Sequence, residues 1–124
     1  MTEALHTCPC CGFPTLEARA VFDICEICWW EDDGQDAPYA DEVWAGPNKD
    51  YSLTMARQNF LAHRHMYDAG EGIDVVEFPD ANRLALLAYV NKVLDREVGL
   101  DPKRLGQLLS MPQSPHRPMP RSSP

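Results

Sequence analysis

The stretches Cys8-Pro9-Cys10-Cys11-Gly12-Phe13 and Cys25-Glu26-Ile27-Cys28-Trp29-Trp30 decide the fold of this chain. Each stretch contains two cysteines in the spacing C-x-x-C, and the thirteen residues 12–24 separate the two pairs. A C-x-x-C pair on a turn directs two thiolates toward one point, and two such turns close a tetrahedral shell around a metal ion. The sequence therefore predicts one structural Zn²⁺ held by Cys8, Cys11, Cys25 and Cys28.

Other uses of paired cysteines match the sequence less closely. A thioredoxin-like redox pair needs a surrounding βαβ pattern, which neither pair has. A disulfide framework is typical of secreted chains with an even number of cysteines, whereas this chain has five, and we expect no signal peptide. The fifth, Cys10, leaves two interpretations open: a small buried apolar side chain, or a sharper role as a reactive thiol or an alternative ligand.

The charge of the chain argues against a nucleic-acid-binding protein. The chain has a formal net charge of −8, and residues 1–34 contain one lysine or arginine, Arg19, against seven acidic side chains. Phosphate backbones are bound by clustered lysine and arginine, so this part of the chain should repel them. An acidic surface instead attracts a basic protein and speeds its encounter.

The chain length and residue pattern predict an α+β fold. Residues 1–34 are predicted to form a zinc ribbon with two Cys-x-x-Cys knuckles on short hairpins, in which residues 15–24 supply one or two short strands joined by a turn. Residues 35–50 combine Gly, Pro, aromatic and acidic residues without a period, which is typical of an irregular loop. Residues 51–110 are predicted to form two to three helices packed on the ribbon, and we expect the proline-rich residues 111–124 to form a disordered tail.

Capping residues place the predicted helices. Ser52 begins a helix that continues by its apolar spacing to Gly70, and Asp80 begins a second that ends near Gly99. Asp101 and Pro102 begin a short third helix over 102–110. Residues 73–78 are predicted to form a short strand or extended link.

We expect no catalytic activity. The chain contains no Gly-x-Ser-x-Gly, P-loop, Gly-x-Gly-x-x-Gly or His-Glu-x-x-His motif. His63 and His65 would lie about 200° apart on a helix, so they should not share a metal ion. Five reduced cysteines and the absence of an apolar run of about 18 residues predict a cytoplasmic protein without a membrane span.

Several motifs together resemble the bacterial cysteine-rich CPCC family over residues 6–66. They comprise Cys8-Pro9-Cys10-Cys11-Gly12-Phe13, the stretch from Ile24 to Gly34, Asn48, Ser52-Leu53, Ala56-Arg57 and Asn59-Phe60. The resemblance implies a small zinc-binding protein, and some members resemble the immunity partners of bacterial toxins. Residues 70–124 lie outside it.

Two functions of different classes follow. The first is a zinc-stabilised protein-binding module, such as an immunity protein or antitoxin that neutralises a basic toxin. Its predicted contact surface combines tryptophans with carboxylates, which suits an interface anchor and a cationic partner: Trp30, Glu31, Asp32, Asp33 and Trp44. The alternative is a zinc-ribbon regulator acting on nucleic acid or transcription machinery, which rests on fold analogy.

Overall fold

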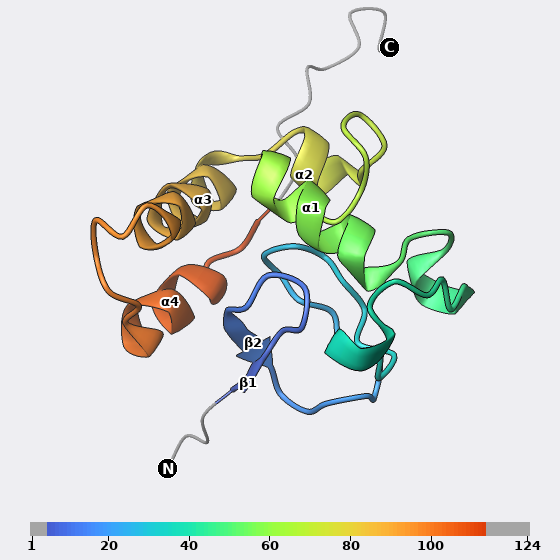
Figure 1. Cartoon of the computed structure of the whole chain (residues 1–124). Helices are drawn as coiled ribbons and strands as arrows, with labels where there is room; N and C mark the ends of the chain where they lie inside the picture. The colour runs from blue at the N-terminus through green and yellow to red at the C-terminus, as the bar shows by residue number, and fades with distance from the viewer. Residues whose placement is uncertain (1–4, 114–124) are drawn as a thin grey trace, which may run out of the picture. The chain divides into compact units, whose positions relative to one another are not determined.

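The computed structural model describes residues 5–113, and the chain divides into two compact units, Met1–Glu71 and Gly72–Pro124. The first unit contains a two-stranded antiparallel hairpin and one α-helix, and the second contains three α-helices (Figure 1). The chain is thus of the α+β class, as predicted. The unit that contains the cysteines extends to Glu71, well beyond the predicted ribbon module over 1–34.

The hairpin of the first unit is short. Strand β1 (His6–Thr7) pairs with β2 (Pro14–Leu16), with an irregular register between His6 and Thr7. The second cysteine pair is carried by a loop whose ends meet in a single bridge between Ile24 and Glu31. The first unit is therefore built mainly from loops that converge on the cysteines, and its strands are fewer and shorter than a ribbon predicts.

Of the one or two strands predicted over 15–24, the structure has only the end of β2, because a carboxylate bends the backbone after Leu16. Asp23 Oδ2 accepts hydrogen bonds from the backbone N–H groups of Glu17 and Ala18, both at 3.0 Å. Ala20 and Phe22 then take positive φ values of 60° and 67°, which extended strands do not contain. This segment is consequently a compact loop from residue 17 onward.

Helix α1 (Leu53–His63) begins as predicted and ends earlier than predicted. The Ser52 hydroxyl accepts the Met55 N–H at 3.1 Å, which confirms the cap. Arg64 takes the left-handed conformation with φ 73°, and its guanidinium donates to the carbonyl of Leu61 at 2.6 Å. Because that turn ends the helical path, residues 64–70 are not helical, and the predicted continuation to Gly70 is wrong.

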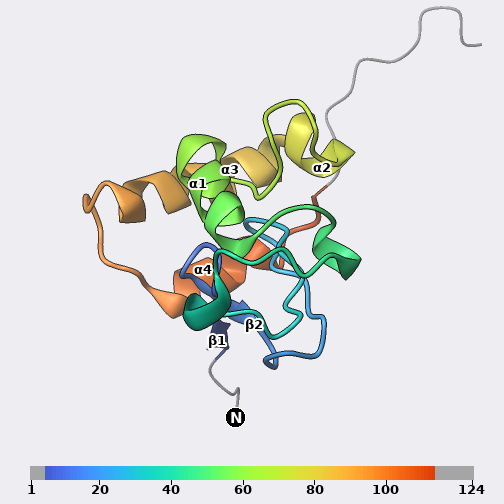
Figure 2. The ribbon, with the colours of Figure 1, turned by 45° about the vertical axis from the view of Figure 1, so that its right-hand side comes forward.

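Contacts between distant residues attach α1 to the cysteine loops. Arg57 Nε donates to the Pro9 carbonyl at 2.8 Å, and the Met66 N–H donates to the Cys28 carbonyl at 2.8 Å. The rings of Phe13 and Phe60 meet edge to face with centroids 6.3 Å apart. Figures 1 and 2 both show α1 lying along these loops. The helix is therefore part of the unit that surrounds the cysteines.

The second unit contains helices α2 (Asp74–Glu77), α3 (Ala81–Leu94) and α4 (Pro102–Leu109). Asp80 and Asp101 cap α3 and α4 as predicted. Their Oδ1 atoms accept the backbone N–H groups of Arg83 and Lys103 at 2.8 and 3.0 Å. Residues 73–78 contain the short α2 instead of the predicted strand or extended link.

Helix α3 ends at Leu94, five residues before Gly99. Asp95 forms its C-terminal cap, and the following Arg96 turns with φ 60°. Gly99 is therefore not the capping residue that the sequence predicted. Of the predicted tail, residues 114–124 lie outside the part of the chain that the structure describes.

Candidate metal centre

The two cysteine knuckles have the same backbone hydrogen bonds. In the first, the Gly12 N–H donates to the Cys8 carbonyl at 2.9 Å, and the Cys8 N–H donates to the Phe13 carbonyl at 2.9 Å. In the second, the N–H groups of Trp29 and Cys25 donate to the carbonyls of Cys25 and Trp30 at 2.7 and 3.0 Å. Two chain segments thus present their cysteine pairs in equivalent turns, as the repeated spacing predicts.

These turns bring the four predicted sulfur atoms together. The Sγ atoms of Cys8 and Cys28 are 3.6 Å apart, as are those of Cys11 and Cys25, and all four lie within 4.8 Å of one another. Sulfur atoms on a tetrahedron with metal–sulfur bonds of about 2.3 Å are separated by about 3.8 Å. The donor set and its spacing therefore fit one metal ion bound by four thiolates.

Burial shapes the acidity of these thiols in the metal-free chain. Cys8, Cys25 and Cys28 are fully buried and Cys11 is 9% exposed. Burial raises the pKa of the Cys11 and Cys28 thiols well above the usual range. Burial acts in the same direction at Cys25, but hydrogen bonds from the neighbouring thiols and from Thr15 outweigh it and lower the pKa of Cys25. Hydrogen bonding and burial therefore act in opposite directions on the pKa of Cys25.

Two groups outside the four thiols donate hydrogen bonds to Cys25 Sγ. The Thr15 hydroxyl donates to Cys25 Sγ at 3.0 Å, and the Ile27 N–H donates to the same sulfur at 3.4 Å. Donors aimed at a ligand sulfur stabilise its thiolate and hold its orientation toward a metal. Thr15 precedes Cys25 by ten residues and belongs to no cysteine motif, so sequence reasoning had no signal to identify it.

Cys10 is outside the group of four ligand cysteines, although its thiol interacts with that of Cys28. It is buried, with 7% of its surface exposed, yet it is not in the group whose ligand atoms converge. Its place agrees with the first of the two interpretations of this residue, a small buried apolar side chain. Within residues 5–113, the four cysteines are the one group of three or more His, Cys, Asp or Glu side chains that converges closely enough for a metal ion.

A family model described as cysteine-rich CPCC matches residues 6–71, which include both knuckles and α1. The chain belongs to the cysteine-rich CPCC family. The match ends where the first compact unit ends, at Glu71, so the CPCC match covers the metal-centre unit alone. Comparisons with curated proteins and with solved structures found no match.

The predicted contact residues of this CPCC protein lie in different environments. Trp44 is 41% exposed, and Glu31 and Asp33 are partly exposed. Trp30 and Asp32 are fully buried, which corrects their predicted place on a contact surface. The two residues are part of the interior and are not available to a partner in this structure.

Asp32 is buried because it organises the loop between the knuckles. Its Oδ2 accepts the Arg19 Nε at 2.7 Å and the Ala20 N–H at 2.8 Å, and its Oδ1 accepts the Gly34 N–H at 3.2 Å. Arg19 also donates to Asp36 at 2.8 Å, and this contact lowers the pKa of Asp36. The acidic run at 31–33 is therefore partly a structural element of the CPCC unit.

The two histidines lie closer together than helical geometry predicts. The rings of His63 and His65 have centroids 4.4 Å apart, because Arg64 ends the helix between them. His63 Nε2 contacts the Tyr67 carbonyl at 2.5 Å, and His65 Nδ1 accepts the Tyr67 N–H at 3.2 Å. These contacts hold the turn after α1, and the expectation of a wide separation is wrong.

No helix among residues 5–113 combines the length and the apolar character that a membrane crossing requires.

Gly12→Ala should lower the free energy of unfolding of the CPCC unit by about 1 kcal/mol. Gly12 has φ 81°, and a Cβ placed there would meet no atom within 4 Å, so the cost is that of the left-handed backbone alone. Gly106→Ala in α4 is the matched control, because a Cβ placed there also meets no atom within 4 Å. The alanine should stabilise the helix by about 0.5–1 kcal/mol. Hydrogen exchange of the amides in each unit measures both effects. Equal destabilisation by the two changes would contradict this account.

Proposed function

We propose that this CPCC protein is a small zinc-stabilised module that binds another protein and has no catalytic role. Zinc is the metal because four thiolates in a tetrahedral arrangement match its preferred ligands and geometry. With four protein ligands the shell leaves no open position for substrate or water, so the ion would act structurally. Its binding energy would stabilise a unit that contains few regular hydrogen-bonded elements.

The observation that carries a binding role is a hydrogen-bonded loop that exposes large apolar side chains. Tyr39, Val43 and Trp44 are 51%, 52% and 41% exposed. The rings of Tyr39 and Trp44 lie 6.0 Å apart, and Trp44 Nε1 donates to Glu42 at 3.0 Å. Tryptophan and tyrosine are enriched among interface residues that dominate binding energy. We name residues 39–44 the aromatic loop.

A buried glutamine holds the aromatic loop in place. The Gln35 side-chain amide donates to the carbonyls of Tyr39 and Glu42, both at 2.6 Å, and Gln35 itself is fully buried. The Thr54 N–H donates to the Ala40 carbonyl at 2.9 Å, which attaches the loop to α1. A loop held in one conformation loses less entropy on binding than a flexible one. These contacts support its use as a contact surface.

Charge supports a basic partner. The protein carries a net charge of −8, and the aromatic loop contains Asp41 and Glu42, both exposed. Complementary charge increases the association rate and selects against acidic partners. A basic bacterial toxin is a partner of this kind, which would make the protein an immunity protein or antitoxin. We propose that it acts in the cytoplasm, in keeping with its reduced cysteines.

Trp44→Ala should raise the dissociation rate of the partner by about thirtyfold, the effect of losing about 2 kcal/mol at an interface hot spot. Asp41→Lys should instead lower the association rate and weaken its dependence on salt. The partner is obtained by affinity capture of the zinc-loaded protein from its own cells and identified by mass spectrometry. Rates are then measured by surface plasmon resonance.

Leu61→Ala is the control for this experiment, because Leu61 is 65% exposed on α1 and lies outside the aromatic loop. It should leave both rates unchanged. Unchanged rates for Trp44→Ala and Asp41→Lys with a captured protein would place the contact surface elsewhere. Specific capture of nucleic acid in place of a protein would favour the regulator and overturn the proposal.

A further inference from the structure

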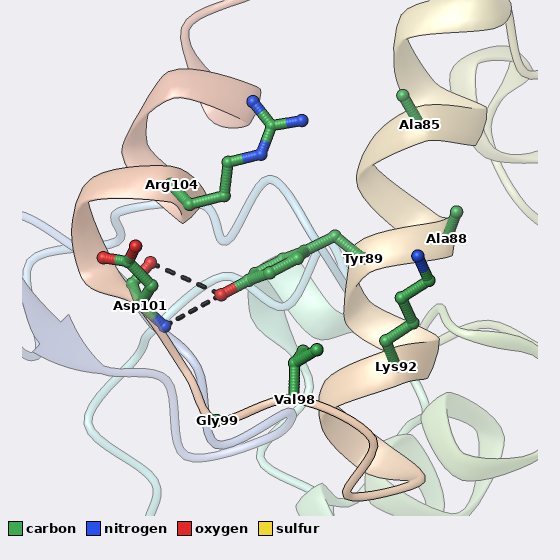
Figure 3. Close-up of a pocket in the computed structure, with 8 residues that line it drawn as sticks. All are labelled: Ala85, Ala88, Tyr89, Lys92, Val98, Gly99, Asp101 and Arg104. Atoms are coloured by element: carbon green, nitrogen blue, oxygen red, sulfur yellow. Dashed lines mark hydrogen bonds between the residues drawn. The ribbon is translucent and has the colours of Figure 1, made fainter.

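The second unit contains a groove between α3 and α4 that lies outside the CPCC match. Its volume is about 500 Å³, within the range of about 300–1,000 Å³ that small-molecule sites occupy. Ala85 and Ala88 line it from α3, and Val98 lines it from the loop that follows (Figure 3). The small alanine side chains leave room between the helices, so the groove has apolar walls and an open interior.

Tyr89 supplies a fixed aromatic surface in this groove. Its hydroxyl oxygen accepts the Asp101 N–H at 2.8 Å and lies 3.5 Å from the Asp101 carbonyl oxygen. These contacts join α3 to the start of α4 and hold the phenol ring between the two helices (Figure 3). A planar ligand could therefore stack on the face of the Tyr89 ring.

Two cations flank the ring. Lys92 extends from α3 and Arg104 from α4, on different sides of Tyr89 (Figure 3). Among residues 5–113, neither side chain has an ion pair or a hydrogen bond to a protein group. By contrast, Arg19 in the first unit is paired with two carboxylates.

One carboxylate, that of Asp101, also lines the groove. Asp101 Oδ1 accepts the Lys103 N–H at 3.0 Å, because Asp101 caps α4. The groove therefore combines two cations and one carboxylate, a net positive charge, beside an aromatic face in a protein whose net charge is −8. A local excess of positive charge of this kind favours a negatively charged ligand.

We propose that the groove between α3 and α4 binds a small molecule that joins a flat apolar ring to an anionic group. The ring lies against Tyr89 and the alanine side chains, and the anion lies at the edge of the groove beside Arg104 or Lys92. Guanidinium groups pair with carboxylates and phosphates through two parallel hydrogen bonds, so either anion suits Arg104. This site is independent of the proposed protein-binding function, since it uses none of the aromatic loop.

Amide NMR titration of the full-length, zinc-loaded protein tests the proposal with four probes: phenylacetate, phenyl phosphate, phenylacetamide and acetate. Phenylacetate and phenyl phosphate should shift the amides of residues 85–92 and 98–104 in a saturable manner. The neutral phenylacetamide should bind about tenfold more weakly, and acetate, which lacks the ring, should bind more weakly as well. Comparison of the first two probes shows whether the site prefers a carboxylate or a phosphate.

Single-residue variants test whether Lys92 and Arg104 contribute to the affinity for the anionic probes. Lys92→Ala and Arg104→Ala should each weaken phenylacetate binding by about twofold to fivefold, as expected for exposed ion pairs. Lys103→Ala is the matched control, because Lys103 is an exposed cation on α4 that does not line the groove, and it should change nothing. Three outcomes would overturn the proposal. The first is no saturable shift of the groove amides, and the second is equal affinity for phenylacetate and phenylacetamide. The third is an equal loss of phenylacetate affinity in all three variants.

Discussion

Cys25→Ser is expected to abolish tight metal binding and to unfold the unit Met1–Glu71. Cys25 Sγ lies 3.6 Å from Cys11 Sγ and receives hydrogen bonds from Thr15 and Ile27, so it is the best supported of the four ligands. Structural zinc in small modules contributes apparent binding energies of about 10–16 kcal/mol, which is as large as the whole stability of a typical domain. A serine hydroxyl does not replace a thiolate as a zinc ligand. Native mass spectrometry after a chelator challenge should find no zinc on the variant.

Cys10→Ser is the matched control, because it removes a buried thiol from the same knuckle and lies outside the group of four. It should retain one zinc ion per chain. Retention of zinc by Cys25→Ser together with its loss from Cys10→Ser would show that the ligand assignment is wrong.

Hydrogen exchange of the Cys25→Ser variant also tests the division into two units. Amides of residues 5–71 should lose protection, while those of α3 and α4 should retain part of theirs. The helices of the second unit have apolar contacts of their own that do not depend on the metal, because Leu86 and Val90 of α3 and Leu105 and Leu108 of α4 are buried. Loss of protection across both units would show a single cooperative structure.

Asp32→Asn should lower the free energy of unfolding of the zinc-loaded first unit by about 3 kcal/mol. The carboxylate is fully buried and accepts hydrogen bonds from Arg19, Ala20 and Gly34, so the amide removes the charge that Arg19 faces and leaves donors without acceptors. All three tryptophans, Trp29, Trp30 and Trp44, belong to this unit, so their fluorescence reports its unfolding in denaturant.

Asp33→Asn is the comparison, because Asp33 is partly exposed and its Oδ1 accepts the Gln35 N–H at 3.0 Å. An asparagine oxygen can accept the same bond, so the expected loss is below about 1 kcal/mol. A loss at Asp33 as large as that at Asp32 would contradict the structural role assigned to Asp32.

Features set by residues close together in the chain were predictable from the sequence. The C-x-x-C spacing repeats one local turn twice, and the structure confirms that both turns direct their sulfurs to one place. Helix starts were also predictable, because a cap is formed by a side chain and an N–H group two or three residues away, as at Ser52, Asp80 and Asp101. The family could likewise be identified from motifs that lie within residues 6–71.

Features set by distant residues were decided by the tertiary structure alone. Trp30 and Asp32 belong to an aromatic and acidic run that resembles a contact surface in sequence, but the fold places both in the interior. Helix α1 ends at His63, although its apolar spacing continues, because Arg64 turns and Met66 hydrogen-bonds to the carbonyl of Cys28. The groove around Tyr89 needs α3, α4 and the intervening loop together. Burial, helix ends and cavities depend on which remote segments meet, and residue patterns over three or four positions do not contain that information.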